Sequence, residues 1–430
     1  MKKLHIISIM LVILSFSGCR DTFTEVFTAN SPVYMGYEEL RQAVKPSTAR
    51  SLEKPGKIYF KDNYLFVVED RKGIHIVSIE NPASPQTLSF IEVPGCVDIA
   101  IKGSTLYADS YVDLVAIDVS DLNNIKEVTR LQDVLPYIVP PADNDYRMAE
   151  VDKDKGVVID WEVKKVQQEM DYEYYPIFPI YPMWGGTREM DYLASNGGGG
   201  VGGSSGSSFG VGGSMARFGL YNEYLYAVDN NKCYMFDVSN PASPINAGSQ
   251  SVGWDVETMF IYDHHMFLGT MNGMIILSLE VPLAPKYVST FNHVTSCDPV
   301  VVSDGYAYVT LRGGQVCRST TNRLDVIRLS ADYKSNQMVA TYVMNSPYGL
   351  GIDGDILFVC DGDAGLKVYN VEDKLAINTH QLAVFPNIKT YDVIPVNGLL
   401  FMIGADGFHL YDYSDIQNIR LLGKIPVSNN

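Results

Sequence analysis

Two cysteines in the second half of the chain could carry thiol chemistry. Cys297 and Cys317 lie twenty positions apart and bracket two short runs rich in β-branched residues, which Asp304-Gly305 joins. Such a pair could form a disulfide, bind a metal, or remain as two buried thiols. Neither a C-x₂-C spacing nor a nearby histidine pair supports a zinc site. The choice between the other two depends on the compartment and on the fold.

The N-terminus has the pattern of a secretory signal. A basic start, MKK, precedes the apolar run HIISIMLVILSF, which is too short to span a bilayer as a permanent helix, and SGC follows and ends at Cys19. This pattern resembles a bacterial lipoprotein signal, in which cleavage before the cysteine leaves a lipid such as palmitate on it. An ordinary signal with a chance cysteine is the alternative. We expect a signal peptide at 1–18, a lipidated Cys19, and a polar tether to residue 55.

The predicted export from the cytoplasm and the negative net charge restrict the classes of molecule that the chain could bind. Outside the cytoplasm a disulfide can persist. The formal net charge is −17, and removal of the signal, with Lys2 and Lys3, makes it −19. An acidic exterior argues against nucleic acid and anionic lipid headgroups as partners, so the membrane would be reached through the N-terminal lipid.

The rest of the chain repeats one pattern. Each copy has a strand-like run, a turn with Asp, Asn or Gly, a second run rich in β-branched residues, and a polar or Pro-containing corner. A short apolar strand precedes each copy and another follows, which predicts a four-stranded antiparallel meander. The seven copies begin near Tyr64, Leu106, Tyr224, Met266, Ala307, Leu357 and Leu399.

The length and number of these units predict the fold class. Each unit has roughly 42 residues, the size of a propeller blade. The absence of a sustained 3.6-residue periodicity excludes a helical solenoid, and a β-sandwich would not repeat at one period. We predict an all-β fold, a seven-bladed β-propeller of four-stranded antiparallel blades over residues 56–430, interrupted by an insertion at 133–214.

The third strand of the units resembles a known repeat. The runs LVAIDVS from Leu114, CYMFDVSNPASP from Cys233 and LKVYNVED from Leu366 are similar to the LVIVD repeat, which is named after such a strand. Its members are predicted or observed as β-propellers, and many are lipoproteins of Bacteroidota. The resemblance therefore implies a propeller and an outer-membrane lipoprotein that faces the periplasm or the cell surface. It implies no activity.

A propeller would favour a disulfide between Cys297 and Cys317. The first two strands of a blade are antiparallel, so the start of the first and the end of the second lie at the same end. The loop after the second strand is longer here than in the other units. The Cα separation of a disulfide is then reachable, and the closed loop would contribute roughly 3 kcal/mol. The other cysteines of the repeats fit the core as small hydrophobes: Cys96, Cys233 and Cys360.

Charged residues recur near the start of the first strand of each unit, although a slip of one residue would turn a side chain to the other face. The positions, in order, are Lys57, Asp98, Arg217, Glu257, Asp298, Gly349 and Asp392. We expect a charged ring at the channel mouth, with a gap at the glycine. A self-compensated salt-bridge network is the first interpretation, because buried charges are normally paired. The alternative is that the four acids bind Ca²⁺, which Arg217 would oppose; we assign no metal and no other cofactor.

The insertion combines a strand-like run, GVVIDWEVKKV from Gly156, with two unusual stretches. Asn196–Ser214 is almost pure Gly and Ser and predicts a flexible linker; it lacks the GK[ST] ending of a phosphate loop. Asp171–Trp184 is rich in aromatic residues and proline. Its rings pack on the propeller as a lid or form a contact surface for a protein or a glycan. They belong to Tyr172, Tyr174, Tyr175, Phe178, Tyr181 and Trp184.

Little in the sequence indicates catalysis. The chain has only seven histidines, and neither an H-E-x-x-H motif nor an EF-hand loop is present, so we assign no catalytic residue. The sequence predicts a surface-anchored lipoprotein propeller that acts as a non-catalytic binding or assembly platform for another envelope protein. A glycan-binding surface lipoprotein is the alternative, and a Ca²⁺-dependent propeller hydrolase is a third.

Overall fold

Short strands and tight turns make up most of the computed structural model, which describes residues 22–171, 211–293, 299–314 and 320–428. The chain divides into two units. The first comprises Met1–Gly36 and Val139–Thr187, and the second comprises Tyr37–Ile138 and Arg188–Asn430. Within the described residues, no helix is long and apolar enough to cross a membrane.

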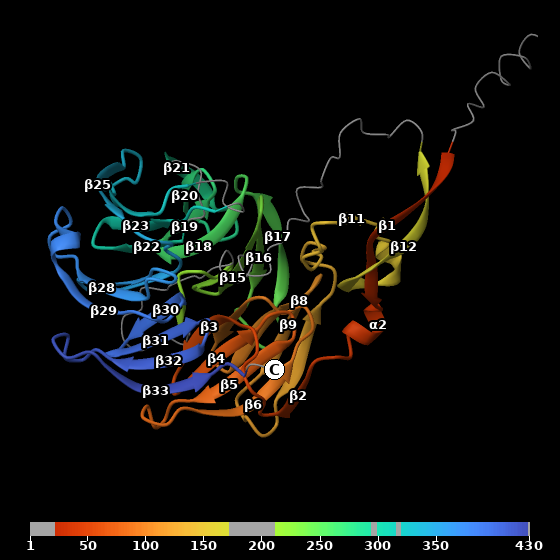
Figure 1. Cartoon of the computed structure of the whole chain (residues 1–430), viewed down its shortest axis with the longest axis horizontal. Coiled ribbons are helices and arrows are strands. Elements are labelled where there is room, and N and C mark those ends of the chain that lie inside the picture. Colours follow the sequence, from red (N-terminus) through yellow and green to blue (C-terminus); the bar gives the residue numbers. More distant parts are fainter. Residues whose placement is uncertain (1–21, 172–210, 294–298, 315–319, 429–430) are drawn as a thin grey trace, which may run out of the picture. The chain divides into compact units, whose positions relative to one another are not determined.

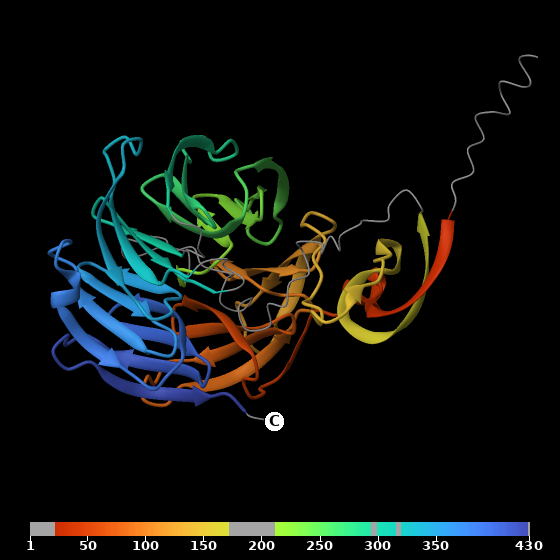
Figure 2. The same cartoon turned by 45° about the horizontal axis from the view of Figure 1, so that its top comes forward.

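The second unit is built of four-stranded antiparallel meanders. Figures 1 and 2 show its sheets following one another in chain order around a common centre, from orange to blue. The first sheet contains β3(Pro55–Lys61), β4(Tyr64–Glu69), β5(Gly73–Ser78) and β6(Gln86–Glu92), and the second contains β7(Ile99–Lys102), β8(Thr105–Ser110), β9(Asp113–Asp118) and β10(Lys126–Leu131). The third contains β14(Phe218–Tyr221), β15(Tyr224–Asp229), β16(Lys232–Asp237) and β17(Ile245–Ser251). The fourth contains β18(Val256–Tyr262), β19(His265–Thr270), β20(Gly273–Ser278) and β21(Lys286–Asn292).

Three further sheets have the same order. They are β22(Val300–Ser303), β23(Tyr306–Leu311), β24(Arg323–Arg328), β25(Gln337–Val343); β26(Leu350–Asp353), β27(Ile356–Cys360), β28(Leu366–Asn370), β29(Gln381–Phe385); and β30(Thr390–Val396), β31(Leu399–Gly404), β32(Gly407–Asp412), β33(Arg420–Pro426). Two short strands extend the first sheet to six: β2(Lys45–Thr48) on β6 and β13(Val211–Gly212) on β3. The unit also contains the short helices α2(Tyr37–Leu40) and η3(Ile377–Thr379).

Local sequence explains the turns. Between the first and second strands the chain needs residues with positive φ, because the tight hairpin turns that match strand twist require them. Asp62, Asn222, Asp304, Gly354 and Asn397 occupy these positions with φ between 48° and 55°. The turn residues that the sequence repeats in every unit are therefore the ones that this backbone requires.

The corner after the third strand is fixed by side chains. The Asp118 carboxylate accepts a hydrogen bond from the Ser120 N–H at 2.9 Å, and Asp237 accepts one from Ser239 at 2.8 Å. Such Asx turns end a strand without leaving its last donors unpaired. They explain why the third strand ends in the D-V-S pattern.

The first strands of the sheets, here called the inner strands, contact one another in a closed ring. They run β3, β7, β14, β18, β22, β26 and β30, and β30 returns to β3. An apolar core closes the last junction, where the rings of Phe60 and Phe401 stack with centroids 4.8 Å apart. Leu52 also bridges to Val427, and its carbonyl accepts the Ser428 N–H at 2.8 Å. The two ends of the unit are therefore joined.

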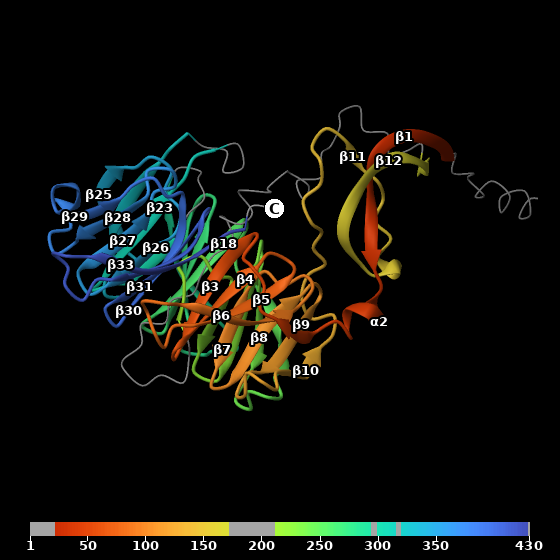
Figure 3. The same ribbon diagram turned by 60° about the horizontal axis from the view of Figure 1, so that its bottom comes forward.

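The first unit contains a long two-stranded ribbon. β1(Thr22–Met35) pairs antiparallel with β12(Val157–Asp171), and β11(Arg147–Met148) adds to β1 (Figure 3). The short helix η1(Lys153–Lys155) precedes β12. The register runs from Thr22 opposite Asp171 to Met35 opposite Val157.

The all-β class and the four-stranded antiparallel sheets are confirmed. The structure differs from the predicted tether over 19–55, because β1, α2 and β2 lie within it. The partner of β1 lies more than a hundred residues later, in the insertion, so no neighbouring segment in the sequence indicated that this stretch would pair. The run from Gly156 is a strand, as predicted.

Candidate functional site

Three of the predicted ring residues are buried at the inner strands. Lys57 lies in β3, Asp98 directly precedes β7, and Asp392 lies in β30; they are 6%, 3% and 4% exposed. Lys57 Nζ lies 3.1 Å from Asp98 Oδ2. Burial lowers the pKa of Lys57, and the charge of Asp98 opposes this effect. The pair therefore neutralises two charges that would be costly to bury alone.

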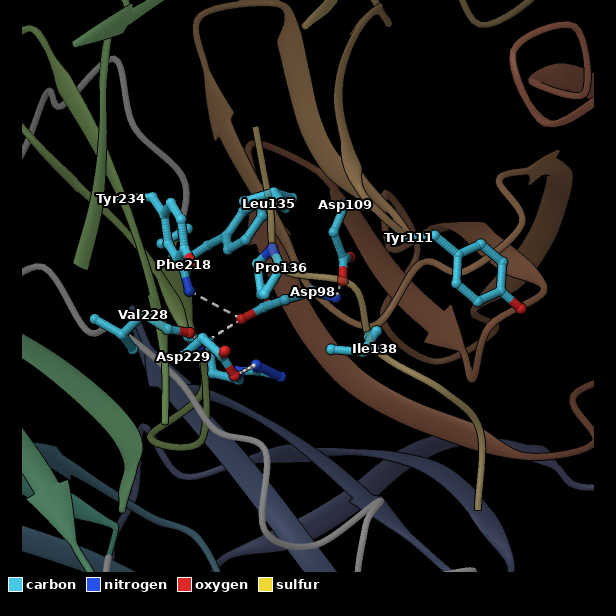
Figure 4. A pocket seen from close by; sticks show the side chains of 12 residues that line it. Asp98, Asp109, Tyr111, Leu135, Pro136, Ile138, Phe218, Val228, Asp229 and Tyr234 are labelled. Carbon is cyan, nitrogen blue, oxygen red and sulfur yellow. Dashed lines mark hydrogen bonds and ion pairs between the residues drawn. The ribbon is translucent and has the colours of Figure 1, made fainter. Parts of the chain in front are cut away.

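Asp98 is held on several sides. Its Oδ1 accepts the Ile99 N–H at 2.8 Å, and its Oδ2 accepts the Phe218 N–H at 2.9 Å as well as the Arg217 N–H. Figure 4 shows the bonds that run from Asp98 to the backbone near Phe218. With Lys57, this single carboxylate links the first, second and third sheets.

Asp392 has weaker compensation. Its Oδ1 accepts the Val393 N–H at 2.9 Å and the Ser214 hydroxyl at 3.2 Å, and that hydroxyl accepts the Leu350 N–H at 2.8 Å. Burial raises the pKa of Asp392 to about 7, although these hydrogen bonds and the charge of Lys57 act in the opposite direction. Near neutral pH this carboxyl is therefore partly protonated.

Two glycines make room for this carboxyl. A Cβ on Gly213 would lie 1.8 Å from Asp392 Oδ2, and one on Gly349 would lie 2.3 Å from Oδ1. Neither distance is possible for a real side chain. The gap that the sequence predicts at Gly349 is thus occupied by the carboxyl group of Asp392.

The chain itself runs among the inner strands. Val211 and Gly212 pair antiparallel with Phe60 and Tyr59, on the side of β3 opposite β4. We call residues Val211–Ala216 the axial segment. From Gly212 onward it is buried.

The axial segment bonds to widely separated sheets. Through Ser214 it reaches β26 and β30, and the Ala216 carbonyl accepts the Met259 N–H of β18 at 3.2 Å. It therefore occupies the space that the inner strands enclose. The flexible linker predicted for Asn196–Ser214 is wrong for Val211–Ser214, where small residues serve close packing; the preceding part lies outside the described residues.

Arg217 contributes its backbone to the cluster, while its side chain turns toward its own sheet. Its Nε donates to the Val228 carbonyl at 3.1 Å, and its Nη2 lies 3.0 Å from Asp229 Oδ1. Glu257 lies in β18 and is half-buried. The structure thus pairs Lys57 with Asp98 and places Lys57 near enough to Asp392 to lower its pKa. Arg217, which the salt-bridge interpretation assigned to the ring, pairs instead with Asp229 of its own sheet.

Sequence reasoning missed a second set of carboxylates, at the ends of second strands. Asp109 accepts the Val97 and Asp98 N–H groups at 2.8 and 2.9 Å, and burial raises its pKa to about 6. Asp361 likewise accepts the N–H groups of Asn345 and Ser346 at 2.9 and 2.8 Å, and Glu69 accepts those of Glu53 and Lys54. An acid at the same place in VVED, YADS and VCDG was the signal that could have revealed them.

A small hollow lies beside Asp98. Asp109, Tyr111, Ile138 and Tyr234 are among its lining residues (Figure 4), and its volume is about 30 Å³. This is room for about one or two water molecules. Ligand pockets have volumes of about 300–1,000 Å³, so the hollow beside these acids is too small for a sugar or a peptide side chain.

Several predicted site residues lie outside the described residues. They are Cys19, Cys297, Cys317, Asp298, Tyr172, Tyr174, Tyr175, Phe178, Tyr181 and Trp184. The three cysteines assigned to the core, Cys96, Cys233 and Cys360, are buried free thiols, as predicted. Burial raises the pKa of each, that of Cys233 to about 12, so they remain protonated.

No group of three or more His, Cys, Asp and Glu side chains is arranged to hold a metal ion in the part of the chain that the structure describes. Two of the acids proposed as Ca²⁺ ligands, Asp98 and Asp392, already have the partners described above. Asp98 in particular faces the ammonium group of Lys57 at 3.1 Å.

Comparison with known proteins gives one family match. A model of the LVIVD repeat matches residues 56–91, 96–133 and 212–251. Each match covers one four-stranded sheet, namely β3 to β6, β7 to β10, and β14 to β17. LVIVD repeats are therefore present in three places, and repeats of this kind are typically found in β-propellers. No curated protein matches the chain.

Several solved structures resemble the chain in fold. BamB from Moraxella catarrhalis has 10% identity and a TM-score of 0.45, with 90% of this chain and 92% of that chain covered. Hsv2 from Kluyveromyces lactis has 10% identity and a TM-score of 0.47, with 87% and 100% covered. The computationally designed Ika8 protein has 9% identity and a TM-score of 0.49, with 88% and 90% covered.

Asp392 should make stability depend on pH. Its pKa is about 7 in the folded chain and about 4 in an unfolded one, so the folded state binds more protons between these values. The free energy of unfolding should therefore fall by an amount on the order of a few kcal/mol as pH rises from about 4 to 7. Asp392→Asn, which cannot ionise, should remove this part of the slope in chemical unfolding at a series of pH values.

Asp109→Asn is the matched control. Burial also raises the pKa of Asp109, but only to about 6, so its part of the slope ends at lower pH. The two variants should differ between pH 6 and 7. Identical pH profiles for wild type and Asp392→Asn would show that Asp392 is ionised at neutral pH.

Close packing around the axial segment should make Gly213 sensitive to a single methyl group. Gly213→Ala forces Cβ against Asp392, so we expect a loss of about 1–3 kcal/mol in chemical unfolding. Gly36→Ala, where nothing lies within 4 Å, should change stability by less than about 0.5 kcal/mol. The cost of Gly213→Ala should shrink in an Asp392→Ala background. An equal cost in both backgrounds would refute the contact.

Proposed function

We propose that the chain is a seven-bladed β-propeller that serves as a non-catalytic binding or assembly platform for another envelope protein. The axial segment is the observation that carries this proposal. It occupies the space between the inner strands, where it bonds to β3, β18, β26 and β30. The hollow beside Asp98, as the described residues form it, has a volume of about 30 Å³. We therefore place the partner on the loops and faces of the ring.

The strand order supports seven blades. Each of the seven sheets has its inner strand next to that of the following sheet, and β30 contacts β3. Three sheets carry LVIVD repeats, and the other four have the same order of strands. Strands in the middle of the sheets, such as β8, are buried along their whole length, as expected where each sheet lies between two others.

The N-terminal signal pattern supports a lipid on Cys19 after removal of residues 1–18. Together with the LVIVD repeats, this pattern fits an outer-membrane lipoprotein of the kind found in Bacteroidota, facing the periplasm or the cell surface. The formal charge of −19 after cleavage is unfavourable for binding to anionic headgroups.

An exposed tryptophan marks the end of the ring where binding should be sought first. Trp254 lies in the loop between β17 and β18 and is 73% exposed. This loop is at the end of the ring where the inner strands begin. Val343, at the end of β25, is 88% exposed at the same end. Tryptophan is enriched among the residues that dominate binding energy at protein interfaces.

A photo-reactive amino acid at position 254 should cross-link a partner in native membranes. The matched control is position 281, because Val281 is 61% exposed in the loop between β20 and β21, at the opposite end of a neighbouring sheet. We expect one defined protein adduct from position 254 and none from 281. Trp254→Ala should then weaken the isolated complex by about 2 kcal/mol.

The other outcomes separate the alternatives. A polysaccharide adduct at 254 would favour the glycan-binding function. Equal labelling from 254 and 281, or no adduct from either, would contradict a platform that uses this end of the ring.

We also propose a disulfide between Cys297 and Cys317. The described residues that flank them support it, because the Thr310 N–H donates to the Pro299 carbonyl at 3.2 Å and so joins the start of the first strand to the end of the second. Peptide mapping of exported protein without reduction should find the two cysteines linked, and Cys297→Ser should lower stability by roughly 3 kcal/mol. Alkylation of both thiols without reduction would refute the bond.

A further inference from the structure

The ribbon of the first unit begins very close to the proposed lipid. Only two residues, Arg20 and Asp21, separate Cys19 from Thr22, where β1 starts. Three residue steps span at most about 11 Å. If Cys19 carries the lipid, the start of β1 lies within or against the headgroup layer, because each polar layer of a bilayer is only about 5–8 Å thick.

The register brings the chain back to the same place. Thr22 is opposite Asp171, Glu25 is opposite Gln168, and pairing continues to Met35 opposite Val157. At about 3.3 Å per residue, the ribbon is about 45 Å long. The chain therefore leaves the anchored end at Thr22, runs the length of the ribbon, and returns to that end at Asp171, from which it continues into residue 172.

Side-chain contacts fasten the ribbon along its length. Near its open end, Arg147 Nη2 lies 2.8 Å from Glu25 Oε1, and its guanidinium lies over the Phe27 ring at 4.0 Å. In the middle, the Asn30 amide donates to the carbonyls of Asp143 and Tyr146, both at 2.8 Å. These contacts bring a third segment against the two strands.

The far part of the ribbon is fastened as well. The Trp161 indole donates to the Pro140 carbonyl at 2.8 Å, and the Tyr34 hydroxyl accepts the Asp152 N–H at 2.7 Å. Gly156 has a φ of 120°, and a Cβ there would lie 2.0 Å from the Met35 carbonyl oxygen. A two-stranded ribbon alone would be marginal, so these contacts explain how it holds its shape.

We infer that the β1–β12 ribbon is a stiff spacer whose open end, at Thr22 and Asp171, rests on the lipid bilayer. The inference depends on the proposed lipid at Cys19. The partner is the lipid surface itself. Its consequence is that the chain meets the membrane at two points far apart in sequence, Cys19 and Asp171.

The test measures depth along the ribbon in phosphatidylcholine vesicles. A fluorescent amino acid replaces Thr24, near the open end, or Asp160, which pairs with Val33 near the other end; both positions are exposed. The two sites are about 30 Å apart along the strands. With a headgroup-labelled quencher lipid, quenching at 24 should be several-fold stronger than at 160.

Two results would overturn the inference. Strong quenching at both positions would mean that the ribbon lies flat on the bilayer, and weak quenching at both would mean that its end is not at the surface. Mass spectrometry of the same protein reports the lipid on Cys19 independently, so failure of the anchor is distinguishable from failure of the spacer. Cys19→Ser should abolish vesicle binding and the difference between the two sites.

Discussion

The closed ring depends on how the chain crosses its own centre. The axial segment brings backbone N–H and C=O groups into a space lined by inner strands, where every polar group needs a partner. Asp392 supplies an acceptor, Met259 supplies a donor, and the Ser214 hydroxyl acts as both; Asp98 accepts the N–H groups of Arg217 and Phe218 directly after the segment. Little room remains for side chains beside Asp392, which explains the small residues Gly212, Gly213 and Ser214, whereas Met215 packs into an apolar core.

The two buried carboxyls at the centre, Asp98 and Asp392, differ in how far a cation compensates their charge. Lys57 forms its ion pair with Asp98. Asp392 has a hydroxyl and an N–H group as its nearest donors, so burial dominates and raises its pKa to about 7. A buried carboxyl with a raised pKa can remain inside the protein because it takes up a proton. At high pH it loses that proton, so the contacts of Asp392 become weaker than those of Asp98.

Local patterns predicted what local physics determines. Turn residues, the D-V-S corner and the alternation of strands all depend on neighbours in sequence, and the sheets appear where they were expected. The residue types of the ring were also found, yet the sequence could not show that Arg217 would offer its N–H group to Asp98 and its guanidinium to Asp229. Which of these two groups faces Asp98 depends on the direction of the backbone at Arg217.

Pairings between distant segments were missed for a different reason. The partner of β1 is β12, which lies in the insertion, while β13 is two residues long and pairs with an inner strand about 150 residues earlier in sequence. A partner so far away in sequence cannot be identified from either strand alone. Both pairings depend on backbone hydrogen bonds, and in the ribbon also on side-chain contacts from a third segment, which a local pattern does not reveal.

The repeat also limits where specificity can arise. The seven sheets share one order of strands, and many of them repeat the same turns and corners. In the first, second and sixth sheets an acid also holds the backbone at the end of the second strand. These features fix the ring and recognise nothing outside it. Features that do not recur from sheet to sheet among the described residues are different: the exposed Trp254, the Arg312 guanidinium 4.2 Å above the Tyr348 ring, and the end of the insertion in the axial segment. Because that insertion is held inside the ring at one end, a partner that binds it would act on a segment already fixed to the core. Binding energy would then not be spent on ordering that end of the insertion, which is the usual cost of recognition by a long loop.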